Sequence, residues 1–322
     1  MANKLTYSSS PHIKSYRTTR DIMLHVCIAL LPACIMGVVY FGLKALLLLA
    51  LSVISAVGAE IIFNLINGKT FKESLNAFDF SSVVTGLLIG MVIGTNYPWY
   101  APILGSIFAI IVVKMLFGGT GKNVVNPAIV GRIFIFMSFQ TVVTAWVVPF
   151  TGELVAGATP LVDVIKGNAL KLSNWDLFLG LGVAGCIGET CKLALVVGAI
   201  YLAIVGVINI IYPIIYIAVT GLLTVCLMGF DFSLFLPTIL TGGLMLGALF
   251  MATDYTTTPN TTLGNVIYFT LLGLVTAGLR IATQMEVVSF AILLMNLIVP
   301  LIDKFVINRP FGFKKIKKEK DN

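Results

Sequence analysis

The chain has 322 residues, of which 58% are hydrophobic and only 11% are charged, and its mean hydropathy is +1.01. A soluble globular protein carries roughly 25% charged residues, so the composition excludes a conventional cytosolic enzyme, a disordered chain and a disulfide-stapled secreted module. The net charge of +7 would suggest a nucleic-acid partner in a soluble protein. Here the charges gather at the chain ends and in a few loops, so we expect a membrane protein that binds no nucleic acid.

Ten apolar runs approach the roughly 20 residues that a helix needs to cross a bilayer. They are long and unbroken rather than alternating, which favours helices over a transmembrane β-barrel. The glycine-rich stretch from Leu177 to Glu189 predicts, in addition, a short interrupted half-helix. We expect the ten helices over residues 22–41, 43–66, 81–95, 98–117, 129–149, 189–209, 213–229, 234–251, 264–280 and 286–302.

Lys and Arg residues set the orientation of these helices. If the N-terminus faces the cytoplasm, 15 of the 21 cationic side chains fall in inner segments and four in outer segments, while Lys114 and Lys192 lie inside helices. Cationic loops stay on the cytoplasmic side, so the pattern predicts that both termini are cytoplasmic. The basic tail is an orientation signal, with a lipid or partner contact as the alternative. We expect Lys114 to extend its ammonium to the inner membrane surface.

A short sequence repeat indicates the architecture. Phe-Asp-Phe-Ser starts at Phe78, before the third helix, and again at Phe230, before the eighth. Related tripeptides follow the two helices at Thr95 and Thr253. Because each copy holds an odd number of helices, five, the second copy must lie upside down in the membrane. We therefore expect an all-α polytopic membrane protein of two inverted five-helix repeats with broken helices and with ligands between the repeats.

The expected organisation follows from these helices. It comprises a cytoplasmic N-terminal segment 1–21, a first five-helix repeat 22–149, an extracytoplasmic loop 150–176, a second repeat 177–303 and a basic cytoplasmic tail 304–322. Long loops without secondary structure are usually functional. In this loop, small residues and Pro160 expose Thr159 to a modifying enzyme, although an ordinary turn is the alternative interpretation.

Acidic residues inside the spans are candidates for an ion path. An acid at mid-membrane costs about 2.5 to 3.5 kcal/mol on insertion scales, so such residues usually face a cavity, a cation or a partner. Glu60 and Glu189 are the best candidates, and for Glu189 an ion pair with Lys192, one turn along, is the competing interpretation. The carboxylates within or beside spans are Glu60, Glu189, Asp79, Asp231, Asp254 and Asp303.

Other patterns are not sites. The run from Gly180 to Gly185 matches GxGxxG, but no strand precedes it, so it indicates helix packing or a kink. The five cysteines include no CxxC pair, and His12 and His25 are too far from paired cysteines to predict a metal site.

Four stretches resemble one family. They begin at Ser8, Phe117, Gly188 and Gly242, and a fifth match near Ser289 extends the similarity over nearly the whole chain. The family comprises the D subunits of Rnf electron-transport complexes and the homologous B subunits of sodium-pumping NADH:quinone oxidoreductases. The short N-terminus is similar to that of the Rnf members.

This resemblance implies a covalent flavin. Members carry FMN joined through its phosphate to the threonine of a Ser/Thr-Gly-Ala-Thr motif, added on the outer face by a flavin transferase. The matching residues here are Gly157, Ala158 and Thr159, with Thr159 as the acceptor. Two positions depart from the motif, because Ala156 replaces its first hydroxyl residue and Glu153 replaces the usual aspartate. The flavin supplies the redox chemistry, and the ester keeps it at a fixed place.

The resemblance also implies a second, non-covalent flavin, riboflavin, between helices. The stretch from Gly242 to Tyr255 suits it, although close helix packing through small residues is the alternative. Backbone amides beside the glycines before Asn123 are expected to bind an anion or a flavin edge. Arg132 fits that role and, equally, that of an inner anchor. The candidate cofactor-binding residues in these stretches are Asn123, Asn126, Arg132, Gly243, Gly247, Thr253 and Asp254.

The function implied is that of a flavoprotein subunit of a translocase. It passes electrons between ferredoxin and NAD, moves Na⁺ or H⁺ through a path that includes Glu60 and Glu189, and is active only with the other Rnf subunits in a bacterial or archaeal cell membrane. Ferredoxin and NAD must react on those subunits, because this chain has no nucleotide-binding or iron-sulfur motif. The alternatives are a redox-inactive channel or transporter and a scaffolding subunit, because inverted repeats also form pores.

Overall fold

The computed structural model describes residues 17–143, 145–156, 160–165 and 172–307. The regular secondary structure of these residues is helical except for one two-stranded sheet. The first half contains α1 (Thr19–Phe41), α2 (Leu43–Ile66), α3 (Phe71–Asn76), α4 (Ser81–Met91), α5 (Tyr100–Phe108), the π-helix η1 (Ala109–Met115), α6 (Pro127–Ser138) and α7 (Gln140–Val143). The middle contains β1 (Ala145–Val147), β2 (Leu154–Ala156), α8 (Pro160–Ile165) and α9 (Asn174–Leu179). The second half contains α10 (Lys192–Val205), α11 (Ile211–Leu227), the short 3-10 helix η2 (Phe232–Leu234), α12 (Phe235–Leu240), α13 (Leu244–Leu246), the π-helix η3 (Gly247–Met251), α14 (Thr262–Thr283) and α15 (Val288–Phe305).

Several of these helices are long and apolar enough to cross a membrane. In the described part of the chain they are α1, α2, α14 and α15, and the bent pair Phe232–Leu240 and Leu244–Met251 makes a fifth if it is one broken span. Their outward faces are also apolar, because side chains such as Ile35 and Ile54 are 60% and 67% exposed. Such helices suit a lipid surround. The shorter apolar helices are Ser81–Met91, Tyr100–Met115, Pro127–Ser138, Lys192–Val205 and Ile211–Leu227.

Local signals explain where helices begin. Thr18 caps α1, because its Oγ1 accepts a hydrogen bond from Asp21 N at 3.2 Å and Asp21 Oδ2 accepts one from Thr18 N at 3.0 Å. Asp79 Oδ1 accepts a hydrogen bond from Ser81 N at 3.0 Å before α4, and Asp231 Oδ1 accepts one from Ser233 N at 3.0 Å before α12. The repeated tetrapeptide therefore forms the same hydrogen-bonded turn in both halves.

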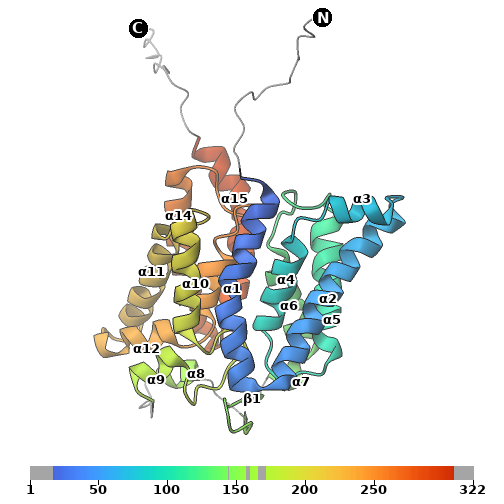
Figure 1. Ribbon diagram of the computed structural model, residues 1–322. Coiled ribbons are helices and arrows are strands. Elements are labelled where there is room, and N and C mark those ends of the chain that lie inside the picture. Colours follow the sequence, from blue (N-terminus) through green and yellow to red (C-terminus); the bar gives the residue numbers. More distant parts are fainter. Residues whose placement is uncertain (1–16, 144, 157–159, 166–171, 308–322) are drawn as a thin grey trace, which may run out of the picture.

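The two halves pack against each other through α1 and α10, which run in opposite directions. Arg17 Nη1, just before α1, donates to Gly206 O at the end of α10 at 3.3 Å, while Tyr40 Oη near the end of α1 donates to Leu179 O of α9 at 2.6 Å. Figure 1 shows that α1 begins and α15 ends at one end of the molecule, which we call the terminal end. β1, α8, α9 and α12 lie at the opposite end.

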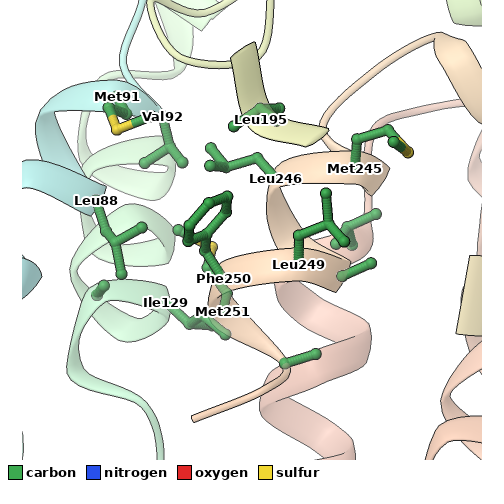
Figure 2. Close-up of a cluster of buried hydrophobic side chains, with 14 of the residues drawn as sticks. Leu88, Met91, Val92, Ile129, Leu195, Met245, Leu246, Leu249, Phe250 and Met251 are labelled. Carbon is green, nitrogen blue, oxygen red and sulfur yellow. The ribbon is translucent and has the colours of Figure 1, made fainter. Parts of the chain in front are cut away.

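A shared hydrophobic core lies between the halves (Figure 2). Leu88 of α4 and Ile129 of α6 meet Leu195 of α10, Leu246 of α13 and Phe250 of η3, and none of these side chains is more than 5% exposed. Helices from both halves therefore fold as one body.

Unwound backbone of the second half pairs with the first half. Ile187 N donates to Ile93 O at 3.1 Å and Gly188 N donates to Met91 O at 2.7 Å, so the segment before α10 is hydrogen-bonded to the chain just past α4. A Cβ at Gly188 would meet the Met91 side chain, so the close approach requires glycine. Irregular backbone is tolerated at membrane depth where protein groups satisfy it, as they do here.

One expected helix is wrong in its second part. The predicted helix 129–149 ends at Ser138, and α7 and the β1–β2 hairpin follow. The hairpin pairs Ala145 with Ala156 and Val147 with Leu154 in antiparallel register. Its residues are apolar, β-branched or aromatic, and such a run fits a short strand as well as a helix. The described chain is therefore helical with one short hairpin.

Candidate functional site

Four of the residues predicted to bind a cofactor come together around one cavity. This terminal-end cavity has a volume of about 760 Å³, including the space at its open mouth. It lies between α1, α4 and the end of α10, and the loops after η1 and η3 close it. The four predicted residues that line it are Asn123, Asn126, Thr253 and Asp254.

Asn126 and Asn123 join the loop after η1 to the second half. Asn126 Oδ1 accepts a hydrogen bond from Ala128 N at 2.9 Å and thus caps α6, while its Nδ2 donates to Met251 O at 3.0 Å. Asn123 Nδ2 donates to Thr256 Oγ1 at 3.1 Å. Both amides therefore fix one wall of the cavity.

Thr253 and Asp254, which follow η3 in the second half, form another part of that wall. Asp254 Oδ2 accepts a hydrogen bond from Thr256 Oγ1 at 2.8 Å, and Thr253 Oγ1 donates to Leu249 O at 2.8 Å. Apolar side chains such as Val84 and Phe250 form the remaining surface. A largely apolar cavity with a few fixed amide, hydroxyl and carboxylate groups has the kind of lining that suits an aromatic ligand with polar edges.

The predicted ion-path residue Glu60 lies in a buried ion pair beside this cavity. Its Oε2 is 3.0 Å from Nζ of Lys114, and the two side chains are 10% and 3% exposed. Lys114 Nζ also donates to Ser81 Oγ at 2.7 Å and to Ser82 Oγ at 3.1 Å. The expectation that Lys114 reaches the membrane surface is therefore wrong, because a buried carboxylate and two hydroxyls bind its ammonium inside the protein.

The second predicted ion-path residue, Glu189, pairs with a cation of the first half. Its Oε1 lies 3.2 Å from Nη1 of Arg132, which α6 carries between the halves. Arg132 therefore lies inside the protein, where Glu189 pairs with it, rather than in a position to act as an inner anchor. Lys192, Glu189 and Glu286 line a smaller cavity, which we call the opposite-end cavity. Lys192 was the alternative ion-pair partner of Glu189, but the cation that pairs with Glu189 is Arg132.

Gly243 makes room for this ion pair. A Cβ at Gly243 would meet Glu189 Oε1, and a Cβ at Gly242 would meet Glu286 Oε2. The helix break between α12 and α13 thus accommodates two carboxylates. Gly247, by contrast, lies against Val288 of α15 and makes a helix contact. Neither Gly243 nor Gly247 lines the terminal-end cavity.

A third buried ion pair was not predicted from the sequence. Arg280 of α14 is fully buried, its Nη2 lies 3.3 Å from Glu286 Oε2, and its Nη1 donates to Thr238 O at 3.0 Å. The sequence signal that could have predicted this pair is the position of Arg280 inside an apolar run, because a buried arginine is costly unless a carboxylate pairs with it.

The predicted flavin acceptor lies outside the described residues, together with Gly157 and Ala158. The hairpin that leads to it is described, and Trp146 of β1 pairs with Val155 of β2. Trp146 also lines the opposite-end cavity, and Glu153, between the strands, is exposed. The chain thus approaches Thr159 at the end of the molecule away from the start of α1 (Figure 1).

Long apolar helices, a broken helix pair and buried ion pairs define a multi-pass membrane protein. The chain belongs to the NQR2, RnfD, RnfE family, whose sequence pattern matches residues 6–312.

Curated relatives agree over the full length of the chain. It is 42% identical over 319 residues to the D subunit of the Na⁺-translocating ferredoxin:NAD⁺ oxidoreductase complex of Acetobacterium woodii, with 98% of each chain covered. It is 35% identical over 329 residues to the D subunit of the proton-translocating ferredoxin:NAD⁺ oxidoreductase complex of Clostridium ljungdahlii, with 97% of this chain and 98% of the relative covered. It is 31% identical over 352 residues to the D subunit of the ion-translocating oxidoreductase complex of Escherichia fergusonii, with 96% and 98% covered.

Proposed function

We propose that this chain is a membrane flavoprotein subunit of an ion-translocating ferredoxin:NAD⁺ oxidoreductase complex and is active only within that complex. The observation that carries the proposal is the full-length similarity to the D subunits of such complexes. One of these relatives is named for Na⁺ and another for protons, so the proposed ion is Na⁺ or H⁺. The other subunits of the complex are its proposed partners in the bacterial or archaeal cell membrane.

The proposed architecture is two inverted five-helix repeats with both termini in the cytoplasm. The antiparallel contact of α1 with α10, the contact of α6 with α15 and the equivalent turns at Asp79 and Asp231 support it. In this arrangement the terminal end faces the cytoplasm, and the hairpin before Thr159 lies on the outer face.

The proposed electron carrier is FMN esterified to Thr159, which a flavin transferase adds from outside. The family membership and the position of the hairpin support this assignment. When bound, FMN supplies one-electron redox chemistry. The chain's own contribution is to anchor it beside the membrane, and Glu153 supplies an exposed carboxylate for the transferase's cation.

Flavin fluorescence of the denatured protein tests the assignment. In cells that express the flavin transferase, we expect a fluorescent band on a denaturing gel that disappears in Thr159→Ala. Thr151→Ala is the matched control, because Thr151 is an exposed threonine of the same loop that should leave the band unchanged. A dark band from the wild-type chain would instead favour a redox-inactive channel, transporter or scaffold.

The proposed second flavin, riboflavin, binds without a covalent bond in the terminal-end cavity. The amides of Asn123 and Asn126 and the carboxylate of Asp254 supply polar groups for a flavin edge, while apolar side chains face its ring. Phe250 belongs both to the cavity and to the core between the halves (Figure 2). A ligand here would therefore contact both halves of the chain.

The proposed ion path includes Glu60 and Glu189. Each carboxylate is paired with a cation of the chain itself, so an incoming ion must compete with an ammonium or a guanidinium. We expect Glu60→Gln to impair ion transport by the assembled complex, and undiminished transport with intact electron flow would exclude that role.

A further inference from the structure

The ammonium of Lys114 sits in a set of three oxygens. Glu60 Oε2, Ser81 Oγ and Ser82 Oγ lie 3.0, 2.7 and 3.1 Å from Lys114 Nζ. An ammonium has three hydrogens to donate, so these three oxygens satisfy it completely. The lysine side chain is 3% exposed, which means that water contributes little to its solvation.

Other groups hold the oxygens in place from behind. Asp79 Oδ1 accepts hydrogen bonds from the amide and the hydroxyl of Ser81, and Thr120 Oγ1 lies 3.0 Å from Ser81 Oγ. Burial acts to raise the pKa of the Asp79 carboxyl, but the hydrogen bonds of Ser81 and Thr120 and the nearby Lys114 ammonium lower it overall. The cluster therefore holds two carboxylates, Glu60 and Asp79, against one ammonium.

This oxygen set is also suited to a metal cation. One carboxylate and two hydroxyls are oxygen ligands of the kind that bind hard metal cations. The helix dipole of α4, which begins at Ser81, repels a cation at its N-terminus, and the two carboxylates offset that repulsion. The carboxylates of Glu60 and Asp79 thus favour a positively charged occupant of this oxygen set.

The terminal-end cavity offers space for the Lys114 ammonium if it leaves the three oxygens. It belongs to the π-helix η1, and its side chain also lines the terminal-end cavity. π-Helical turns inside apolar helices are often found at functional sites. The long flexible stem of lysine allows the ammonium to move from the oxygens toward the open cavity without a change in the helix.

We propose that Glu60, Ser81 and Ser82 form a monovalent-cation site that Lys114 occupies as a tethered ion, and that Na⁺ binds there only when Lys114 withdraws into the cavity. Binding of Na⁺ at this site is thereby coupled to the presence of the Lys114 ammonium in the cavity. The choice of Na⁺ rests on the proposed function. The tests below measure binding rather than transport, so their failure would leave the proposed electron relay untouched.

The first test removes the tethered ion from the full-length protein purified in detergent. Lys114→Met leaves Glu60 without its partner, and its melting temperature should rise by about 2–4 °C as NaCl replaces choline chloride from about 1 to about 300 mM at constant ionic strength. The wild-type melting temperature should not distinguish the two salts. An equal response of Lys114→Met to both salts would overturn the proposal.

Two variants identify the site. Lys114→Arg keeps a tethered cation and should show no preference for NaCl. Lys114→Met with Glu60→Gln removes both charges and should lose the Na⁺ response. A response that survives in the double variant would place the bound Na⁺ elsewhere and would also overturn the proposal.

The second test uses the wild-type chain and does not depend on the folding of a variant. A brief pulse of acetic anhydride labels accessible amines, and peptide mass spectrometry reads the labelling of Lys114. We expect this labelling to increase severalfold in NaCl relative to choline chloride, while that of the exposed Lys72 stays constant. Equal labelling of Lys114 in both salts would show that Na⁺ does not displace it and would contradict the proposal.

Discussion

Arg132 Nη1 lies 3.2 Å from Glu189 Oε1, and this ion pair joins α6 of the first half to the segment that precedes α10 of the second. The two side chains are 13% and 7% exposed, so neither charge is solvated well by water. A buried charge without its partner costs far more than the net contribution of the pair. The pair therefore makes each half depend on the other for its stability.

Replacement of Arg132 should expose that dependence. We expect Arg132→Met to lower the free energy of unfolding by about 3–5 kcal/mol, because Glu189 is left buried and unpaired. The double variant Arg132→Met with Glu189→Met removes both charges and should be more stable than Arg132→Met alone. Denaturation of the purified chain in detergent measures both values. Additive losses in the double variant would mean that the two side chains do not interact.

Gly243 should be intolerant of any side chain. Gly243→Ala places a methyl group against Glu189 Oε1, so the carboxylate must move away from Arg132, and we expect a loss of about 1–3 kcal/mol. Gly278→Ala in α14 is the matched control, because a Cβ there meets nothing within 4 Å. A helical glycine replaced by alanine gains about 0.5–1 kcal/mol. If both variants had the same stability, the close approach at Gly243 would be wrong.

Hydropathy alone predicted most of the helices. The predicted helix 43–66 coincides with α2, α1 and α14 extend the predicted segments by a few residues, and α15 is shifted a few residues toward the C-terminus. The reason is that a span needs only a long apolar run, which composition reveals directly. The strands at Ala145 and Leu154 were missed for the same reason, because an apolar run of β-branched and aromatic residues does not distinguish a helix from a strand.

The buried ion pairs could be predicted only in part. Glu60 and Glu189 were recognisable as costly acids in apolar runs. Their partners were not, because Lys114 and Arg132 lie 54 and 57 residues away in the chain and meet them only through the packing of helices. For the cavity, the sequence indicated the Asn-containing loop and the stretch from Gly242 to Tyr255 as separate candidates. Only the fold shows that Asn123, Asn126, Thr253 and Asp254 line one cavity and that Gly243 and Gly247 do not.

The charge of Asp79 should give a pH-dependent contribution to stability. Its pKa is lowered in the folded chain, so the contribution is present above the unfolded pKa of about 3.9 and is lost as the pH falls through the folded value. We expect Asp79→Asn to destabilise the chain by about 1 kcal/mol at neutral pH, the scale of one helix cap. The difference from wild type should shrink below about pH 4.

Asp231→Asn is the matched control for that measurement. Asp231 makes the same turn with Ser233, but the residue is exposed, so water screens its charge and the effect should be smaller. Melting temperatures of the three proteins between about pH 3 and pH 7 test the comparison. A constant difference between Asp79→Asn and wild type across this range would exclude the charge as its cause.

A side chain that fills the terminal-end cavity should prevent binding of the non-covalent flavin and leave the covalent flavin in place. Val84 lines this cavity, so Val84→Trp should exclude a ring system from it, and the non-covalent flavin released by acid denaturation should fall at least severalfold. The fluorescent band that depends on Thr159 should persist, because the hairpin that leads to it lies at the opposite end (Figure 1). Val39→Trp on the outer face of α1, where Val39 is 57% exposed, is the control and should retain both flavins. Full retention of the released flavin by Val84→Trp would place its binding site outside this cavity.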